Sequence, residues 1–295
     1  MKSQEIVCFG ELLWDLFPSG KKVGGAPFNV ASSLNSLGAE VHFVSRVGVD
    51  PLGVEILEEV KSQGVSTELI QHDSSHETGK VLVHLDEKGV ANYEIASDAA
   101  WDFIEVHAEA QEKVSQAAAF VYGSLVARAN SLKTLKSFLK VAPFRVFDVN
   151  LRPPHYNLDI LMDLMLQADL LKFNDEELYL LAESLGSPFH SMDQHIAFIA
   201  QKTNTPIVCV TKGKFGAVLY HRDSWFYNSG FKIRVKDTVG AGDSFLATLV
   251  NGLIKAIPLQ LALDNACAMG ALVAGSDGAN PIITEKDLRR FIRKD

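Results

Sequence analysis

Short apolar segments of strand type alternate along the chain with segments of helical periodicity, and this alternation limits the possible folds more than any other feature. The apolar segments lie at residues 6–9, 41–44, 119–122, 145–149, 169–173 and 207–210. Apolar residues repeat at helical spacing in the segments 51–63, 131–141, 158–167 and 175–184. Several strands are apolar on both faces, which is typical of parallel strands covered by helices. The pattern predicts a doubly wound α/β core with a mostly parallel sheet.

Two stretches depart from this alternation and predict a small second β-layer. Residues 80–86 and 91–96 resemble two alternating strands, and Glu87-Lys88-Gly89 between them is a hairpin signal. Residues 12–17, followed by Pro18-Ser19-Gly20, likewise indicate a strand and a turn. Such appendages commonly act as lids. We therefore expect one domain over residues 1–295, with lid segments at about 11–24 and 77–102.

The charge balance argues against a nucleic acid partner. Twenty-eight basic and thirty-six acidic residues give the 295-residue chain a net charge of −8. No basic run is longer than two residues, as at Lys21-Lys22 and Arg289-Arg290, whereas nucleic acid phosphates are bound by clustered basic faces. The hydrophobic fraction of 47% is typical of a globular chain.

The cysteines and the most hydrophobic stretch predict a cytoplasmic protein. Cys8, Cys209 and Cys267 are odd in number, far apart and embedded in apolar segments, which indicates buried reduced thiols. Polar and charged residues interrupt the apolar stretch 249–275, so we expect two buried helices there and no membrane span. The first residues lack the apolar segment of a signal peptide.

A glycine-rich string at residues 237–243, Asp-Thr-Val-Gly-Ala-Gly-Asp, leads directly into the apolar helical segment 246–254. Backbone N–H groups and the helix dipole at such a junction form an anion site, and Asp243 within it suits a proton acceptor beside a phosphate. The alternative is a glycine turn with Asp243 as N-cap. The chain has no P-loop motif, and Phe245 stands where a dinucleotide fingerprint needs a small residue. A nicotinamide dehydrogenase is therefore the weaker hypothesis.

A second glycine cluster at residues 23–31 also opens a helical segment, with Pro27 in the first turn. The paired glycines at the junction of the lid with the core favour a hinge, and Asn29 could present a donor and an acceptor to a polyol. An ordinary tight turn explains these residues equally well.

Together the two clusters resemble the two signatures of the ribokinase-like (PfkB) carbohydrate kinase family, over nearly the whole chain. The first signature covers residues 24–31 and continues through 37–39, 46–48 and 50–53, and the second is the string 237–243. Residues 10–15 and 148–154 are most similar to fructokinases. The resemblance implies a ribokinase-like fold and ATP-dependent phosphorylation of a primary sugar hydroxyl, with fructose 6-phosphate as the expected product. Other kinases of the family, acting on ribose, ketodeoxygluconate or a nucleoside, stay open, as does a catalytically silent sugar-binding protein.

The resemblance also implies roles for single residues. The proton of the sugar hydroxyl would pass to Asp243, and phosphate oxygens would be held by Gly240, Ala241 and Gly242. The sugar would be bound by Asp15, Gly24, Gly25, Asn29, Asn150 and Arg152, and the nucleotide by Asn174, Thr211, Gly213, Gly216 and Asn265. Without the resemblance, Asp15 indicates a solvated side chain and Arg152 a surface ion pair.

Two kinds of ion are implied as well. Glu177 would reach Mg²⁺ through water, and a monovalent cation, K⁺ in the relatives, would lie near Asp237, Val239, Val273, Ser276 and Gly278. Asn174 and Glu177 also form a capping-box pattern, and the two interpretations are compatible. His72 and His76 lie in a polar run that indicates a solvated loop rather than a zinc site.

The predicted hairpin carries an apolar face that needs burial. Val81, Val83 and Leu85 alternate along it, and an isolated small sheet is unstable while both faces are wet. Relatives of the family often bury this surface against a second subunit, so the resemblance implies a homodimer formed lid against lid.

Overall fold

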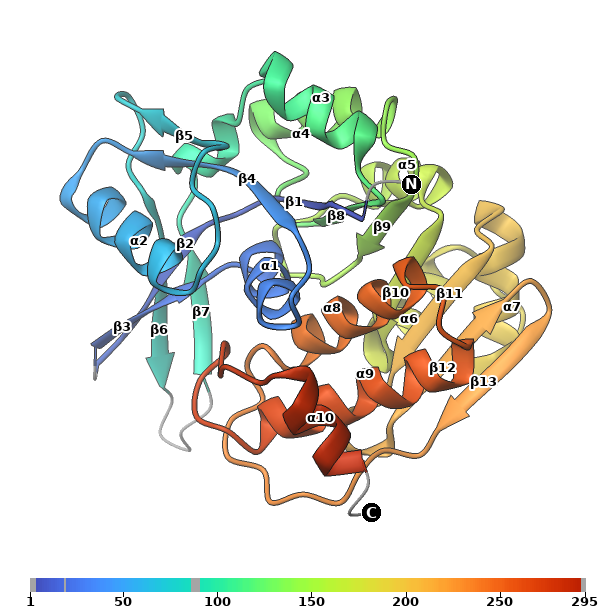
Figure 1. Cartoon of the computed structure of the whole chain (residues 1–295). Coiled ribbons are helices and arrows are strands. Elements are labelled where there is room, and N and C mark those ends of the chain that lie inside the picture. The colour runs from blue at the N-terminus through green and yellow to red at the C-terminus, as the bar shows by residue number, and fades with distance from the viewer. Residues whose placement is uncertain (1–3, 19, 86–90, 293–295) are drawn as a thin grey trace.

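The computed structural model describes residues 4–18, 20–85 and 91–292, and its centre is a nine-stranded sheet (Figure 1). The strand order is β13-β12-β11-β10-β9-β8-β1-β4-β5. The strands are β1 (Ile6–Phe9), β4 (Val41–Gly48), β5 (Ile70–Asp73), β8 (Ala119–Gly123), β9 (Arg145–Asp148), β10 (Leu170–Asn174), β11 (Ile207–Thr211), β12 (Ala217–His221) and β13 (Ser224–Asn228). All pairings are parallel except those of β12 with β11 and β13. The six predicted strands and the mostly parallel sheet are confirmed.

Helices cover both faces of this sheet. They are α1 (Ala26–Ser36), α2 (Pro51–Ser62), α3 (Ala108–Gln116), α4 (Ala129–Leu139), α5 (Leu158–Gln167), α6 (Asp175–Ser184), α7 (Met192–Thr203), α8 (Ala241–Ile254), α9 (Leu259–Ala274) and α10 (Glu285–Ile292). Ile6 and Cys8 of β1 pack in one core cluster with α1, α2, α8 and α9, whereas Val7 and Phe9 pack in another with α3 to α7. Strands that are apolar on both faces therefore lie between two helical layers, as predicted.

The predicted helix boundaries agree closely with the structure except at α8, which begins at Ala241, five residues before the predicted start, because the glycine string itself forms the first turn. The segments 158–167 and 175–184 match α5 and α6 at both ends, and α4 begins two residues before its predicted start. The carboxylate of Asp50 accepts a hydrogen bond from the Gly53 N–H (2.8 Å) and so caps α2. The apolar stretch 249–275 contains the end of α8 and all of α9, and Pro258 is the N-cap residue of α9.

A separate four-stranded sheet, which we call the small sheet, has the order β3-β2-β6-β7. Its strands are β2 (Leu13–Phe17), β3 (Gly20–Gly24), β6 (Gly79–Leu85) and β7 (Ala91–Ile95), at the lower left of Figure 1. The antiparallel pairing of β6 with β7 confirms the predicted hairpin, whose turn Glu87-Lys88-Gly89 is outside the described residues. The strand β3 was not predicted. Val81 is buried beside Leu13, and the side chains of Val83 and Leu85 are not among those described.

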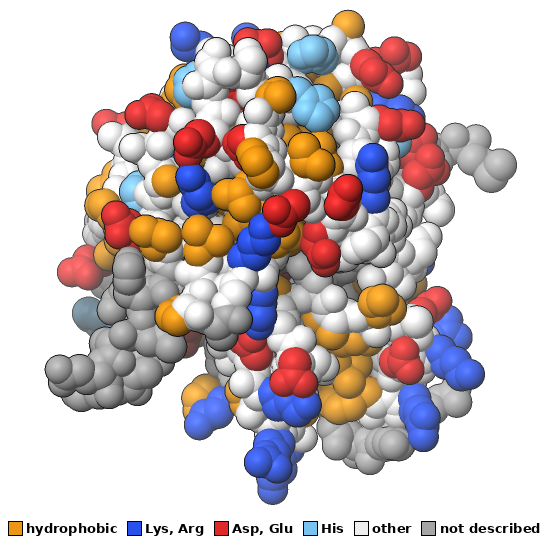
Figure 2. Space-filling view, turned by 90° about the vertical axis from the view of Figure 1, so that its left-hand side faces the viewer, with side chains coloured by type: hydrophobic (Ala, Val, Ile, Leu, Met, Phe, Trp, Pro, Cys, Tyr) orange, Lys and Arg blue, Asp and Glu red, His pale blue; other side chains and the backbone are white. Residues whose placement is uncertain are grey.

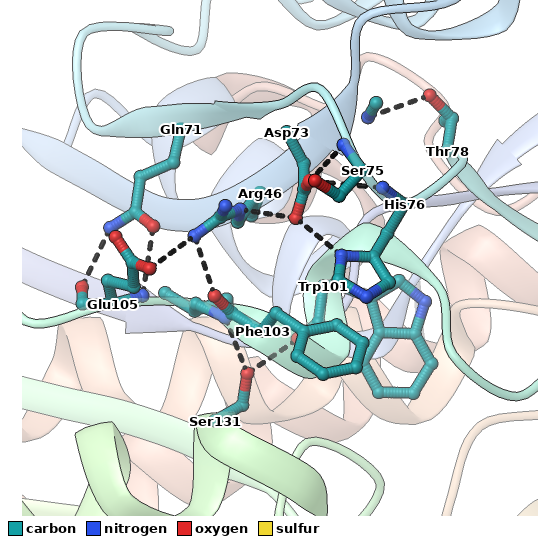
Figure 3. Close-up of polar contacts among 12 residues, drawn as sticks. Arg46, Gln71, Asp73, Ser75, His76, Thr78, Trp101, Phe103, Glu105 and Ser131 are labelled. Carbon is teal, nitrogen blue, oxygen red and sulfur yellow. Dashed lines mark hydrogen bonds and ion pairs between the residues drawn. The ribbon is translucent and has the colours of Figure 1, made fainter.

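Polar contacts hold together the two chain segments that connect the small sheet to the main sheet (Figure 3). Asp73, at the end of β5, accepts hydrogen bonds from the N–H groups of Ser75 (2.7 Å) and His76 (3.0 Å), and its Oδ2 lies 2.8 Å from Nε of Arg46. Arg46 also donates to the carbonyl oxygen of Phe103 (2.8 Å). The rings of His76 and Phe103 stack with 3.7 Å between their centroids. The segment leading to β6 is thus tied to the segment returning from β7.

These contacts correct the interpretation of the polar run around His72 and His76. Residues 70–73 form a strand, Asp73 is buried, and only part of the run is a loop. Among the residues that the structure describes, neither histidine belongs to a group of three or more potential metal ligands.

The cysteines meet the expectation of buried thiols. Cys8, Cys209 and Cys267 are buried free thiols. Within the described ranges, no helix has the length and apolar character needed to cross a membrane.

Candidate active site

The strand order places several of the predicted site residues near the carboxyl ends of the central strands of the main sheet. From β1 the chain proceeds to β4 and β5 in one direction, and from β8 to β11 in the other, so the order reverses between β1 and β8. Ligands of open α/β sheets bind at the carboxyl ends of the strands near such a reversal. Asp15 follows β1, Asn150 and Arg152 follow β9, and Asn174 and Thr211 end the paired strands β10 and β11.

Asp243 lies in the first turn of α8, which begins after the N-cap residue Gly240. Gly240 has a φ of 76°, and a Cβ there would collide with the carbonyl oxygen of Ala279, so the tight turn requires glycine. The interpretation of Asp243 as N-cap is wrong, because Gly240 holds that position without a side-chain cap. The first N–H groups of a helix lack intrahelical acceptors, so those of Gly242 and Asp243 are available to an anion.

A chain of two asparagines orients the Asp243 carboxylate. Asn29, a buried residue of α1, donates from Nδ2 to Oδ2 of Asp243 (2.8 Å). Oδ1 of Asn29 in turn accepts a hydrogen bond from Nδ2 of Asn280 (2.9 Å). The residue predicted to contact sugar thus also contacts the predicted base, and the C-terminal segment supports both.

Charged groups from several elements surround Asp243. Burial raises the pKa of its carboxyl, and the nearby carboxylate of Asp148 raises it further. Lys172, the hydrogen bond from Asn29, and Arg152 act in the opposite direction and lower this pKa. These opposing influences leave Asp243 a carboxylate with increased proton affinity in the first turn of α8.

Glu11 is a second buried acid of the site. Its Oε1 accepts a hydrogen bond from the N–H of Ala26 at the start of α1 (3.1 Å). Its Oε2 is buried without a hydrogen bond to any described residue. Burial raises the pKa of Glu11 to about 7, against the opposing influence of the Ala26 N–H and Arg152.

Asp15 projects from β2 of the small sheet into the same charged region. The carboxylate rests against Gly24, since a Cβ on Gly24 would collide with Oδ2. Burial raises the pKa of Asp15 to about 6, and Arg152 and Lys22 lower it. Asp15 is therefore a partly buried side chain rather than a fully solvated one. Arg152 is exposed and forms no ion pair with any residue in the described ranges. The alternative interpretation, in which Arg152 pairs with an acid on the surface, is therefore wrong.

Asn174 and Glu177 form the predicted capping box at the start of α6. Oδ1 of Asn174 accepts from the Glu177 N–H (2.8 Å), and Oε2 of Glu177 accepts from the Asn174 N–H (2.9 Å). The other carboxylate oxygen, Oε1, accepts from the N–H of Leu151 (2.8 Å). Burial raises the pKa of Glu177, and Lys172 lowers it. Glu177 thus joins the segment of Asn150 to the start of α6.

The predicted nucleotide residues lie on the neighbouring strands and on α9. Thr211 ends β11 and donates from Oγ1 to the carbonyl oxygen of Phe173 (3.3 Å). Gly213 and Gly216 bound the turn that follows, and a side chain at Gly216 would collide with the carbonyl of Asn228, so this glycine also has a structural role. Asn265 lies partly exposed on α9, which packs against β12 and β13.

The two segments predicted to surround a monovalent cation are adjacent. The N–H groups of Lys236 and Asp237 both donate to the carbonyl oxygen of Ala274 (2.8 and 3.3 Å), next to Val273. The Asp237 carboxylate accepts from the N–H of Val239 (3.0 Å). Ser276 and Gly278 follow directly on the second segment, which then reaches Asn280.

Comparison with known proteins shows the family. The chain matches the pfkB family carbohydrate kinase profile over residues 4–286. It belongs to this family. The family assignment makes the chain a sugar kinase, a phosphotransferase with an alcohol acceptor.

Among curated relatives, the chain is similar to a fructokinase of Escherichia coli, with 27% identity over 94% of this chain and 95% of the relative. Among solved structures, it resembles an ATP-bound fructokinase from Xylella fastidiosa, with a TM-score of 0.87 and 24% identity over 100% of this chain and 99% of that chain. A double-mutant fructokinase from Vibrio cholerae, solved with fructose, ADP and potassium ion, has a TM-score of 0.84 and 24% identity over 98% of both chains. Both likenesses show the ribokinase-like fold.

Sequence reasoning missed four residues that contact the predicted site residues or act on them electrostatically. They are Glu11, Asp148, Lys172 and Asn280. Glu11 and Asp148 lie inside the segments 10–15 and 148–154, which already stood out by their similarity to fructokinases. Lys172 was also visible as a lone charge in an apolar strand. For Asn280 the sequence holds no comparable signal.

Proposed function

We propose that this protein transfers the γ-phosphoryl group of ATP to the primary hydroxyl of fructose, forming fructose 6-phosphate. One observation carries the proposal: Asp243, in the first turn of α8, is oriented by Asn29 at a glycine-built anion site. Arg152 acts electrostatically on both Asp15 and Asp243 and lowers the pKa of each. The fructokinase names of the relatives favour fructose as the sugar.

In this proposal the residues divide the reaction between them. Asp243 accepts the proton of the sugar hydroxyl, whose oxygen forms a bond to the γ-phosphorus while the bond to the bridging oxygen of ADP breaks. The N–H groups of Gly242 and Asp243 hold the phosphoryl oxygens as charge develops, whereas the N–H of Ala241 donates to the carbonyl oxygen of Thr238 (3.3 Å) and shapes the turn. Sugar hydroxyls are bound by Asp15, Gly24, Gly25, Asn29, Asn150 and Arg152. The nucleotide is bound by Asn174, Thr211, Gly213, Gly216 and Asn265.

The residues present suit the two ions that we propose. Each oxygen of Glu177 accepts one backbone hydrogen bond and keeps a further lone pair for a water of Mg²⁺, which would neutralise phosphate charge. Asp237, Val239, Val273, Ser276 and Gly278 offer oxygens on two adjacent segments, which suits a monovalent cation such as K⁺ that would stiffen the loop before α8.

We further propose that the small sheet is a lid within one domain over residues 1–295 and that it excludes water from the transferring group. The protein would act in the cytoplasm as a homodimer joined through this lid.

The decisive test replaces Asp243 by asparagine. We expect D243N to lose turnover by about 10²- to 10⁴-fold in an ADP-release assay with fructose, because shape is kept while the proton acceptor is lost. Fructose binding, measured by calorimetry, should be largely kept. The control D163N changes an acid on α5 and should turn over like the wild type. Near wild-type turnover in D243N would overturn the base assignment.

The choice of sugar needs a separate experiment. The wild-type protein is assayed with ATP and, in turn, fructose, ribose, ketodeoxygluconate, adenosine and tagatose phosphate. We expect the highest kcat/KM for fructose. A higher value for another acceptor would leave the kinase proposal standing and change only the substrate, whereas turnover of none of them would support a silent sugar-binding protein.

A further inference from the structure

A buried ion pair lies directly beneath the proposed phosphoryl-transfer site. Lys172 of β10 and Asp148, the last residue of β9, are only 5% and 3% exposed. Nζ of Lys172 lies 3.0 Å from Oδ1 and 3.2 Å from Oδ2 of Asp148. Neither residue belongs to the glycine string, and neither has a role in the reaction as proposed above.

The lysine points toward the anion site. A Cβ built on Gly242 would lie 3.4 Å from Nζ of Lys172, so the ammonium group is directly behind the backbone that we propose for phosphate binding. Asp148, Glu177 and Asp243 all raise the pKa of Lys172 against the effect of burial. The side chain is therefore a permanent positive charge at this point of the site.

Stability alone does not account for such a pair. The desolvation of two buried charges offsets most of their attraction, and apolar side chains of similar volume often serve a core equally well. The position of the pair, between the ends of two central strands and the start of α8, instead suggests a role in the site.

The groups that face Asp243 come from every neighbouring element. They are Asp148 on β9, Lys172 on β10, Asn29 on α1, Arg152 after β9, and Glu11 after β1. Among them Lys172 is the buried cation, whereas Arg152 is exposed to solvent, where water and salt weaken its influence. Without Lys172, the carboxylate of Asp148 would oppose the ionised form of Asp243 and have no buried counter-charge.

We propose that Lys172 is a positioning residue that keeps the Asp243 carboxylate ionised for proton transfer, and that Asp148 holds the ammonium group in place for this task. The same charge lies behind the phosphate-binding backbone and favours the transferring group there. The inference rests on the proposed role of Asp243 as base.

The test is a charge cycle read by the pH dependence of kcat at saturating ATP and fructose, which reports ionisations in the enzyme–substrate complex and is separate from the effect of Asp15 on KM. In K172M the acidic limb should move to higher pH by about one unit or more, because Asp148 then faces Asp243 uncompensated. In D148N the limb should move to lower pH, because Lys172 acts on Asp243 alone. In K172M/D148N it should return toward the wild-type position, since both charges are gone.

A matched control exists on the same two chain segments. Arg145, the first residue of β9, and Asp169, which precedes β10, form an ion pair at the amino ends of these strands. Nε of Arg145 lies 2.8 Å from Oδ2 of Asp169. R145M and D169N remove comparable charges and should leave the acidic limb in place. A purely structural role of the Lys172 pair would lower thermal stability without moving the limb in opposite directions.

The outcomes separate this inference from the proposed function. Limbs that stay fixed in folded K172M and D148N, while D243N is inactive, would overturn the role of the pair and leave the base assignment intact. Retained turnover in D243N would overturn both. If K172M fails to fold, the downward shift expected for D148N and the return in the double variant still decide the question.

Discussion

At the residue scale, the site gathers acids whose proton affinities are set by burial, and Glu11 is the clearest test. Burial raises its pKa from 4.5 to about 7 in the folded protein. Protonation of Glu11 therefore stabilises the folded state relative to the unfolded state. This stabilisation is complete below pH 4.5 and is lost as the pH rises through about 7. E11Q keeps an acceptor for the Ala26 N–H and carries no charge. At pH 8 it should be more stable than the wild type by on the order of 2 to 3 kcal/mol.

Urea unfolding of the ligand-free protein at pH 5 and pH 8 measures this difference. The advantage of E11Q should nearly vanish at pH 5, where the wild-type side chain is protonated. The control E58Q alters an exposed acid of α2 and should change stability little at either pH. Equal stabilities of E11Q and the wild type at pH 8 would contradict the buried, proton-binding state of Glu11.

Asp15 gives a second prediction at this scale. Its pKa is raised to about 6 by burial, so its charged form is lost as the pH falls through 6. In the proposed sugar site the carboxylate accepts hydroxyl hydrogen bonds, and hydrogen bonds to charged groups contribute about 1.5–3 kcal/mol. The wild-type KM for fructose should rise below pH 6. D15N should show a KM raised by about 10- to 100-fold that no longer depends on pH in this range.

Steady-state kinetics between pH 5 and pH 8 provide the measurement. An unchanged KM in D15N at pH 8 would remove Asp15 from the sugar site and leave the assignment of Asp243 untouched.

At the element scale, the start of α8 depends on Gly240. Its φ of 76° strains any other residue, and a Cβ would meet the carbonyl oxygen of Ala279. G240A should therefore displace the first turn of α8, which carries the anion site and Asp243, and lower kcat by at least about 100-fold. Gly38 is the matched control, because it has a similar φ of 73° and open space around its Cβ position. G38A should cost about 1 kcal/mol of stability and leave kcat unchanged.

The pair of variants separates backbone strain from damage to the site. Urea unfolding gives the stability of each protein, and an ADP-release assay gives kcat. Equal kcat values in G240A and G38A would show that the turn before α8 tolerates displacement.

The elements also show what the sequence could and could not predict. The parallel strands, α5 and α6 followed directly from apolar runs and helical periodicity, because burial on both faces leaves a clear pattern. The strand β3 contains two glycines and two lysines and has no alternation to reveal it. Lys172 and Asp148 are 24 residues apart, and Asn29 and Asn280 are 251 apart. Such pairings depend on strand order and on the path of the C-terminal segment, which local patterns do not encode.

At the scale of the whole molecule, the small sheet stands out because its own apolar cluster is small, with Leu13 and Val81 as the buried residues. Figure 2 shows apolar side chains on the face of the molecule that includes α2 and the small sheet. Val81 is buried beside Leu13 within the chain, so its burial does not require a partner. The next residue, Leu82, faces the opposite way along the strand and is 42% exposed, and Val54 of α2 is 60% exposed.

The last prediction concerns assembly. If the dimer forms through the lid as proposed, an exposed apolar residue of the small sheet becomes buried in it, and a charge there is costly to desolvate. L82K should shift the sedimentation of the protein from dimer to monomer and raise the KM for fructose in parallel, because β6 pairs with β2, the strand that carries Asp15. Leu166 of α5, which is 53% exposed, supplies the control, and L166K should remain dimeric with an unchanged KM. A monomeric wild-type protein with full activity would refute the dimer, and a monomeric L82K with an unchanged KM would show that the lid works without its partner.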